Sequence, residues 1–274
     1  MTKKPFILTL FIILLFNTAI TYSQELELSN LFCDNMVLQH GTEVPVWGVA
    51  APKEKIRVKF AGQSVTTRTG KDGKWIVVLA PMEASKTPRE MTISGKKEIV
   101  FSNVVVGEVW ICSGQSNMQF AVSNAPEVDA LLSSAKNIRS FEVKRTVSFK
   151  EEDNVSGKWK DVPPSSAVAF GFAYFLEKAE DIPIGIIHAS WGSSSLEAWM
   201  PRDMAEEFPY FKDIMNDLDA DTETRNRINQ ALSSGEERTT KEDIFMRRQP
   251  NILYNAMMKP LAPYACRGLV WYQG

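Results

Sequence analysis

The chain has 274 residues, of which 44% are hydrophobic and 23% are charged. These proportions are typical of folded globular proteins and exclude disordered, collagen-like and coiled-coil chains. The 31 Lys and Arg residues nearly balance the 33 Asp and Glu residues, giving a formal net charge of -2, so the charge gives no reason to expect nucleic acid as a partner. The length suggests two domains, or one domain with an appendage.

Residues 1–23 are predicted to be a secretory signal peptide. Two lysines precede an apolar stretch from Phe6 to Phe16, and the small residue Ser23 stands where a signal peptidase would cleave. A membrane anchor is the alternative, but the apolar stretch is interrupted at Asn17 and is shorter than the roughly 20 residues that span a bilayer. We therefore expect a secreted or periplasmic protein that begins near Gln24 and has no membrane segment after cleavage.

Cysteine and histidine usage limits the disulfide and metal chemistry of the chain. Cys33, Cys112 and Cys266 form an odd set, so at least one thiol stays unpaired in an oxidising compartment, and spacing alone does not pair them. Neither His40 nor His188 has a neighbour at metal-ligand spacing. We expect no metal site and no cofactor.

Residues 24–103 are predicted to form an all-β sandwich domain. The region consists of short extended runs separated by turns that contain glycine, a pattern typical of antiparallel sandwiches. The runs are Met36 to Gln39, Val44 to Val49, Ile56 to Phe60, Ser64 to Arg68, Trp75 to Leu79, Met91 to Ser94 and Glu98 to Phe101. No nucleophile and base pair occurs among them, so we expect a scaffold or a carbohydrate-facing module.

Residues 104–274 are predicted to form an α/β domain with a parallel sheet, because apolar strand patterns alternate there with helical patterns. The expected strands are Val104 to Cys112, Ile184 to Ala189 and Leu269 to Tyr272, and the expected helices are Ala167 to Ala179 and Ile252 to Met258. Residues 204–249 are polar and are predicted to be a helical insertion, which either covers the mouth of the site or is a solvated excursion. Ligands of such sheets bind at the carboxyl ends of the strands.

The best candidate nucleophile is Ser116, which follows the first of these strands in the turn SGQSNM. Gly114 lets the backbone turn sharply, and the N–H groups at the start of the following helix would face the serine, as a tetrahedral oxyanion requires. The turn differs from the G-x-S-x-G elbow because Asn117 and Met118 follow the serine. A serine at this place is also a common helix N-cap, so both interpretations stay open.

The second strand end has the same shape, and its Gly192 could supply an oxyanion N–H. His188 lies in this strand as either the general base of a serine nucleophile or a satisfied core residue. As the base, its Nε2 would lie within about 3 Å of Ser116 Oγ. The same two alternatives apply to His40 in the front region.

Several motifs together resemble the sialate O-acetylesterases of the SGNH hydrolase superfamily. Those in the rear region are WICSGQSNM at 110–118, SWG at 190–192, LEAWMP at 196–201, LYNAM at 253–257 and LVWYQG at 269–274. Those in the front region are DNMVLQ at 34–39 and VPVWG at 44–48. The resemblance covers essentially the whole chain after residue 23, and GQSNM together with WYQG is a specific combination.

This resemblance implies an SGNH-hydrolase-like parallel sheet and a serine esterase. Ser116 would be the nucleophile, the backbone N–H groups of Ser116 and Gly192 would form the oxyanion hole, and Gln115 and Gln273 would contact the substrate. The implied partner is an acetylated sugar or glycan, such as O-acetylated sialic acid. The implied reaction is two-step acyl transfer, in which the serine takes the acetyl group and water then releases it.

The sequence departs from the family pattern in two places. Ser193 stands where the family has a second glycine, and the chain stops at Gly274, before the family's Glu, its oxyanion Asn and its Asp-x-x-His segment. We therefore expect an incomplete gene product, or one whose remainder is encoded separately, with an open sheet edge and little or no turnover as given. The alternative function is a non-catalytic carbohydrate-binding fragment.

Overall fold

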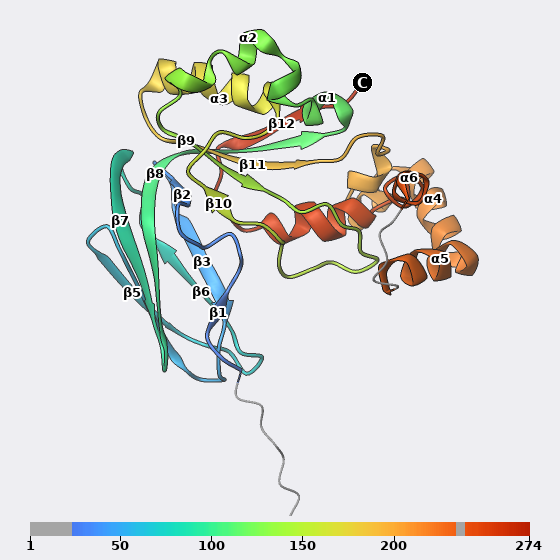
Figure 1. Ribbon diagram of the computed structural model, residues 1–274. Helices are drawn as coiled ribbons and strands as arrows, with labels where there is room; N and C mark the ends of the chain where they lie inside the picture. The colour runs from blue at the N-terminus through green and yellow to red at the C-terminus, as the bar shows by residue number, and fades with distance from the viewer. Residues whose placement is uncertain (1–23, 234–238) are drawn as a thin grey trace, which may run out of the picture.

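The computed structural model describes residues 24–233 and 239–274 (Figure 1). The predicted signal peptide lies outside the described residues. The chain folds into a small three-stranded sheet and a large mixed sheet, with helices packed on the mixed sheet. The strands are β1 (Glu27–Leu28), β2 (Val37–Gln39), β3 (Val44–Val49), β4 (Lys55–Phe60), β5 (Gln63–Arg68), β6 (Lys74–Leu79), β7 (Ser85–Ser94), β8 (Glu98–Gly114), β9 (Ile138–Glu142), β10 (Trp159–Lys160), β11 (Ile184–Ser190) and β12 (Gly268–Tyr272).

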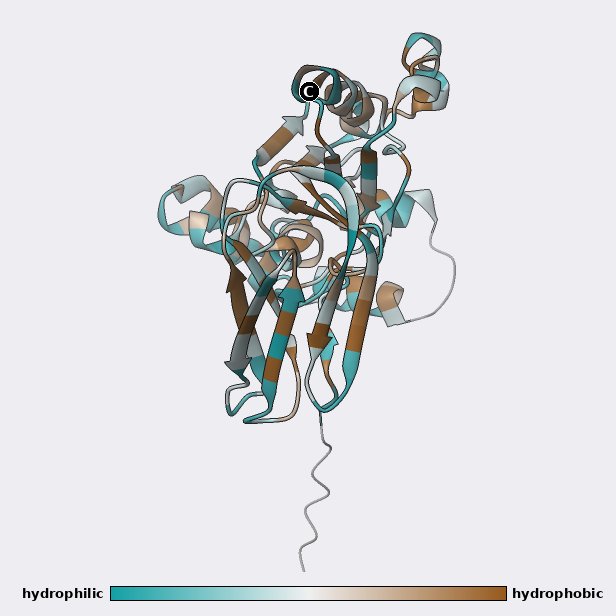
Figure 2. Ribbon diagram, turned by 90° about the vertical axis from the view of Figure 1, so that its left-hand side faces the viewer, coloured by the Kyte–Doolittle hydropathy of each residue, from teal (hydrophilic) through white to brown (hydrophobic). Residues whose placement is uncertain are grey.

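Most strands of the front region pair antiparallel, while the fully buried β2 pairs in parallel with β8. Strands β1, β3 and β6 form the three-stranded sheet, while β4, β5 and β7 extend the mixed sheet. Burial alternates residue by residue along β4 and β6. In β4 the exposed residues are hydrophilic, whereas β6 exposes the hydrophobic side chains of Ile76 and Val78. Figure 2 shows hydrophilic and hydrophobic residues alternating along strands of this region. The inward side chains of both sheets, among them Val46, Val77, Ile56 and Ile93, belong to one hydrophobic core.

Strand β8 joins the front region to the rear region. Its first half pairs antiparallel with β7, and its second half pairs in parallel with β11 and β12. The strand therefore runs without interruption across residues 103 and 104, and Figure 1 shows it curving from one region into the other. Asn103 adopts a positive φ of 54° within it.

The rear part of the mixed sheet is parallel and is covered by helices on both faces. Its strand order is β10, β9, β11, β8, β12, and only β10 runs antiparallel to its neighbour. On one face Ile184 and Ile186 pack with Phe170 of helix α3 (Ala167–Glu180). On the other face Ile187 and Leu253 belong to the main core, which includes the π-helix Tyr254–Met258 (Figure 1).

The α-helices occur in two groups. Those within residues 116–180 lie at one face of the parallel part of the mixed sheet, and those within residues 209–246 lie in the predicted insertion, in which residues 234–238 are not described. The α-helices are α1 (Ser116–Gln119), α2 (Pro126–Asp129), α3 (Ala167–Glu180), α4 (Pro209–Ala220), α5 (Thr222–Ser233) and α6 (Thr240–Met246). Short 3-10 helices span Val122–Asn124, Leu132–Ser134, Glu197–Trp199, Arg202–Glu206 and Lys259–Leu261.

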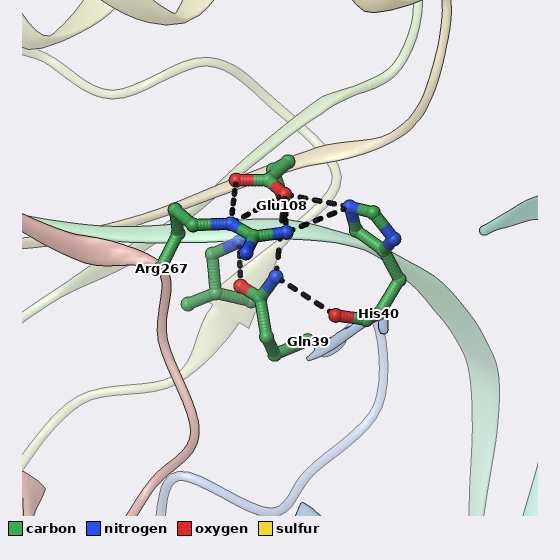
Figure 3. A network of polar contacts seen from close by, with 5 residues as sticks. Gln39, His40, Glu108 and Arg267 are labelled. Atoms are coloured by element: carbon green, nitrogen blue, oxygen red, sulfur yellow. Dashed lines mark hydrogen bonds and ion pairs between the residues drawn. The ribbon is translucent and has the colours of Figure 1, made fainter. Parts of the chain in front are cut away.

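A polar network fastens the two regions together around Glu108 of β8 (Figure 3). Its Oε1 lies 2.6 Å from His40 Nε2, and Arg267 donates to both carboxylate oxygens over 2.7 to 3.1 Å. Gln39 Nε2 donates to the same Oε1, and Gln39 Oε1 accepts from Val109 N at 2.8 Å. The network thus links the end of β2, the middle of β8 and the segment that leads into β12.

The cysteines and acidic side chains offer no covalent or metal cross-link within the described ranges. Cys33, Cys112 and Cys266 are free thiols, and burial raises the pKa of Cys112 to about 12. No group of three or more His, Cys, Asp and Glu side chains in residues 24–233 and 239–274 is placed to hold a metal ion. Over the same ranges, the helices are too short or too polar to cross a membrane.

Candidate active site

The candidate site is formed where the parallel strands end. Because β8, β11 and β12 run in the same direction, Gly114, Ser190 and Tyr272 lie side by side at one edge of the sheet. Gly114 adopts a φ of 136°, and a Cβ there would lie 2.1 Å from the backbone oxygen of Tyr272. Only glycine therefore allows β12 to pair closely while the chain turns into α1.

Ser116 follows this turn and is exposed to solvent as the first residue of α1. The N-cap is Gln115 rather than Ser116, and Gln115 Oε1 accepts hydrogen bonds from both Ser116 N, at 2.6 Å, and Ser116 Oγ. The other end of the Gln115 amide donates to the backbone oxygen of Gly274 at 2.7 Å. The serine hydroxyl is thus held at the helix N-terminus, and N-capping is not its role.

Gly192 lies directly against Ser116. A Cβ on Gly192 would be 3.3 Å from Ser116 Cβ, and the Gly192 N–H donates to Gln119 Oε1 over 2.7 Å. The two N–H groups proposed for the oxyanion hole, those of Ser116 and Gly192, are therefore adjacent and each is bonded to a glutamine side-chain oxygen. A substrate oxygen could take the place of these amide oxygens with the same donor geometry.

The sequence departs from the family pattern at Ser193, in the loop after Gly192, and the loop there adopts a conformation that favours glycine. Ser193 has a φ of 62°, in the left-handed region that favours glycine, so the second glycine of the family would fit without strain. Arg248 Nε donates to Ser193 O at 3.1 Å, and Arg247 lies over the Trp191 ring at 5.5 Å. The carboxyl end of the helical insertion thus flanks this loop.

His188 is not the base of Ser116. Its Nδ1 lies 2.7 Å from Glu142 Oε2, and its Nε2 lies 2.7 Å from Ser190 Oγ. Among the described residues neither ring nitrogen is hydrogen-bonded to Ser116, so the prediction of a His188–Ser116 pair is wrong. Burial alone would raise the pKa of Glu142, but the hydrogen bonds from His188 and Ser165 and the histidine charge outweigh it and lower that pKa.

His40 and Gln273 complete the set of predicted site residues. His40 belongs to the Glu108 network at the junction, away from the strand ends that carry Ser116. Gln273 follows β12, and its Nε2 donates to Ser194 O at 3.3 Å while its Oε1 is buried without a hydrogen-bond partner among the described residues. Gln273 thus lies beside the Gly192 loop with one free acceptor.

Sequence reasoning missed two residues at this edge, Gln119 and Glu142. Gln119 stands one helical turn after Ser116, so the helix that was expected there could have placed it beside the serine. Glu142 ends β9, a strand that the sequence analysis did not predict. Its partner His188 is its direct neighbour across the parallel pair, which only the strand register reveals.

A cavity of about 650 Å³ lies elsewhere, against the three-stranded sheet. Trp47, Asp72 and Lys74 line it from the front region, and Asp153 and Lys259 line it from a loop and a short 3-10 helix of the rear region. Lys74 Nζ and Asp153 form an ion pair of 3.2 Å between these two sides. None of the residues that line this cavity belongs to the Ser116 site.

Comparisons with known proteins show which family the chain is similar to. A family model described as "Carbohydrate esterase, sialic acid-specific acetylesterase" matches residues 106–243, just over half of the chain. The sialate O-acetylesterase of Mus musculus is 29% identical over 274 residues, covering 89% of this chain and 51% of its own length. That of Homo sapiens is 27% identical over 269 residues, covering 88% of this chain and 47% of its own length.

A solved structure, that of a carbohydrate acetylesterase from Xanthomonas citri, superposes with a TM-score of 0.71 at 29% identity. It matches 91% of this chain, which corresponds to 51% of the Xanthomonas chain. The chain thus spans about half the length of the relatives that it matches. With Ser116 in the GQSNM turn beside Gly192, and with a family model over more than half of its residues, the chain belongs to the sialic acid-specific acetylesterase family of carbohydrate esterases.

Proposed function

We propose that this protein is a serine esterase that removes O-acetyl groups from sialic acid or a related acetylated carbohydrate. The observation that carries the proposal is the exposed Ser116 at the N-terminus of α1, packed against Gly192 at the carboxyl edge of a parallel sheet. Family membership supports acetyl esters of carbohydrates as the substrate class. No cofactor takes part in the proposed reaction.

In the proposed reaction Ser116 Oγ attacks the acetyl carbonyl carbon and its proton passes to a base. The backbone N–H groups of Ser116 and Gly192 stabilise the oxyanion, replacing their bonds to the glutamine side chains. The sugar hydroxyl leaves with a proton, and water then attacks the acetyl-enzyme to release acetate and free the serine. Gln115, which is hydrogen-bonded to Ser116, and Gln273, which lies beside the Gly192 loop, are proposed to contact the sugar.

Among the described residues, no side chain that could act as a base is hydrogen-bonded to Ser116. The sequence contains two histidines, and both are hydrogen-bonded to glutamates rather than to Ser116. The Asp-x-x-His pattern of the family does not occur in these residues. Because removal of the base costs such enzymes a factor of about 10⁴ or more, we expect the 274-residue polypeptide alone to turn over little substrate.

Chemical rescue by imidazole tests the nucleophile and the missing base together. Imidazole in the buffer can accept the serine proton, so it should accelerate release of p-nitrophenol from p-nitrophenyl acetate by the wild-type chain beyond the background reaction. Ser116→Ala is the control, because it retains the fold and loses only the exposed hydroxyl. Equal imidazole-dependent rates for wild type and Ser116→Ala would contradict the proposal.

A second function, carbohydrate binding without catalysis, is favoured by the cavity against the three-stranded sheet. Its lining combines the apolar side chains of Trp47 and Ile76 with the carboxylates of Asp72 and Asp153. Indole rings pack on the C–H faces of sugars, and carboxylates accept hydrogen bonds from their hydroxyl groups. Ile76 is 49% exposed, so a ligand would cover apolar surface that is now open to water.

Calorimetric titration with a neutral xylo-oligosaccharide tests this second function. Ile76→Ala should weaken binding severalfold, because it removes apolar surface from the cavity wall. The matched control is Val100→Ala, since Val100 is 46% exposed on a strand outside the cavity. An absence of binding by the wild-type chain would contradict this function and leave the esterase proposal unaffected.

The organisation of the chain is proposed along the same lines. We infer a β-sandwich module over residues 24–103 and a hydrolase module over residues 104–274, with 204–249 as its helical insertion. The apolar stretch in residues 1–23 supports secretion or periplasmic export. N-terminal sequencing of the protein from its native host tests this, and a mature chain that still carries residues 1–23 would contradict it.

A further inference from the structure

Glu142, His188 and Ser190 form a chain of hydrogen bonds beside the candidate site, hereafter the relay. His188 joins Glu142 Oε2 through Nδ1 and Ser190 Oγ through Nε2, each over 2.7 Å. The carboxylate accepts from Nδ1, so in the neutral ring Nδ1 carries the proton and Nε2 accepts the proton of the Ser190 hydroxyl. This is the connectivity of a catalytic triad, but Ser116 is not part of it.

The relay is closed to substrate. His188 and Ser190 are each 3% exposed, and the second oxygen of Glu142 accepts from Ser165 N and Ser165 Oγ at 2.9 and 3.0 Å. The amide that follows the serine, Trp191 N, donates to Gly114 O at 3.1 Å and is not free to hold an oxyanion. A catalytic role for Ser190 is therefore excluded. Ser190 can affect the reaction only by positioning the residues next to it.

Those neighbours are the residues of the proposed oxyanion hole. Ser190 is the last residue of β11 and pairs with Gly114, two residues before the nucleophile. Two residues after Ser190 stands Gly192, whose N–H faces α1 and whose Cα lies against Ser116. The relay thus fixes the point at which β11 leaves the sheet toward Gly192.

That point needs fixing because the following loop is strained. Ser193 holds a φ of 62°, a conformation that a non-glycine residue keeps only when the surrounding contacts impose it. Ser190 is held twice, by His188 through its hydroxyl and by Arg145 Nε, which donates to Ser190 O at 3.2 Å. Loss of the first contact would let the strand end shift and carry Gly192 with it.

We infer that Glu142, His188 and Ser190 are positioning residues that hold the Gly192 amide against Ser116. The inference rests on the proposed function in one respect, namely that the Gly192 amide serves the acyl transfer of Ser116. A purely structural role would change the stability of the whole domain. A positioning role changes the local order at Gly192 and the reactivity of Ser116 more than it changes stability.

The test compares Ser190→Ala with Ser140→Ala, a matched control. Ser140 is also buried, at 1% exposure, and its Oγ donates one hydrogen bond, to Val162 O at 2.9 Å, but it lies on β9 away from Gly192. Amide hydrogen exchange at Gly192 should be roughly tenfold faster in Ser190→Ala and unchanged in Ser140→Ala. The rate at which a fluorophosphonate probe labels Ser116 in imidazole buffer should fall roughly tenfold in Ser190→Ala alone.

Equal changes in the two variants, or no change at Gly192 in Ser190→Ala, would overturn the inference. If Ser116 of the wild-type chain is not labelled at all, the proposed function fails, while hydrogen exchange at Gly192 still decides the positioning role. A measurement on the wild-type chain covers the case in which a variant does not fold. Nitrogen-15 NMR of His188 should show the proton on Nδ1, and a proton on Nε2 alone would contradict the relay.

Discussion

The two histidines of this chain each pair with a glutamate, and the two pairs differ in their third partner. At the junction His40 and Glu108 are joined by Arg267, a cation that donates to both carboxylate oxygens. Near the site His188 and Glu142 are joined by the hydroxyl of Ser190. A cation closes the first network electrostatically, whereas the hydroxyl extends the second to the end of β11. One pair therefore fastens two regions, and the other ends at Ser190, two residues before Gly192.

The two pairs also differ in how deeply their histidines are buried. The side chain of His40 is 25% exposed and that of Arg267 is 48% exposed, so Glu108, at 8%, is the most buried of the three ionisable side chains at the junction. His188 is 3% exposed and relies on its two partners alone. The junction should therefore govern stability, and the relay should govern the geometry at Ser116.

The largest expected effect on stability comes from Glu108→Ala. It leaves Gln39, His40 and Arg267 without their shared acceptor, and we expect the free energy of unfolding to fall by about 3 kcal/mol. Urea denaturation measures this change. Labelling of Ser116 by the fluorophosphonate probe in imidazole buffer should stay at the wild-type rate, and a loss of labelling at native conditions would remove the distinction between the two pairs.

Compared with Glu108→Ala, His188→Leu should lower the stability less and slow the labelling of Ser116 more. It removes the partner of the half-buried Glu142 Oε2 and of the buried Ser190 hydroxyl, which we expect to cost about 2 kcal/mol of unfolding free energy. Labelling of Ser116 should slow by roughly tenfold. The control is His40→Leu, expected to cost about 1 kcal/mol because Arg267 and Gln39 still bind Glu108. Equal rates of Ser116 labelling in the two variants would show that His188 and His40 do not differ in their effect on Ser116.

Gly192→Ala should affect the site with little effect on stability. The new methyl group would lie 3.0 Å from Gln119 Oε1 and 3.3 Å from Ser116 Cβ, and the end of the glutamine side chain can move away. We expect a change of under about 1 kcal/mol in unfolding free energy and a several-fold loss in Ser116 labelling. Thermal denaturation and labelling rates measure the two quantities, and unchanged labelling would separate Gly192 from the reaction.

Acid should weaken both pairs through their carboxylates. Burial opposes ionisation of Glu108, but its hydrogen bonds with Arg267 and His40 outweigh burial, so its pKa, like that of Glu142, lies below the ordinary 4.5. Each folded carboxylate then binds fewer protons than the unfolded one. Their contribution is complete above pH 4.5 and is lost as the pH falls through the lowered values. Urea denaturation over this range should show it, with a flatter profile for Glu108→Gln and no difference if the network is absent.

Most strands of the front region were predictable because turn residues separate short extended runs there. The observed strands Lys55–Phe60 and Lys74–Leu79 differ from the predicted runs by one residue. The long β7 was predicted only at its end, since register shifts interrupt its pairing between Ser85 and Met91. The passage of β8 through residues 103 and 104 was hidden by the polar pair Ser102 and Asn103.

The site was predictable as far as its motif reached. Ser116 and Gly192 stand in sequence patterns that a turn after a strand explains, and the structure brings them into contact. Strand β9 was missed because it carries Arg139 and Ser140 in buried positions, which a reading of hydrophobic patterns rejects. Arg139 is tolerated there because its guanidinium is bonded to Asn35 O, Asn103 and Asp161, which are far away in the sequence. Because β9 was not predicted, its last residue, Glu142, could not be identified as the partner of His188.

Mass spectrometry of the protein after exposure to a fluorophosphonate in imidazole buffer tests most directly whether Ser116 is the nucleophile. We predict one covalent adduct, which maps to the peptide that contains Ser116. The adduct should be absent in Ser116→Ala and should form more slowly in Ser190→Ala. An unmodified wild-type chain, or an adduct on Ser190 or any other serine in place of Ser116, would contradict it.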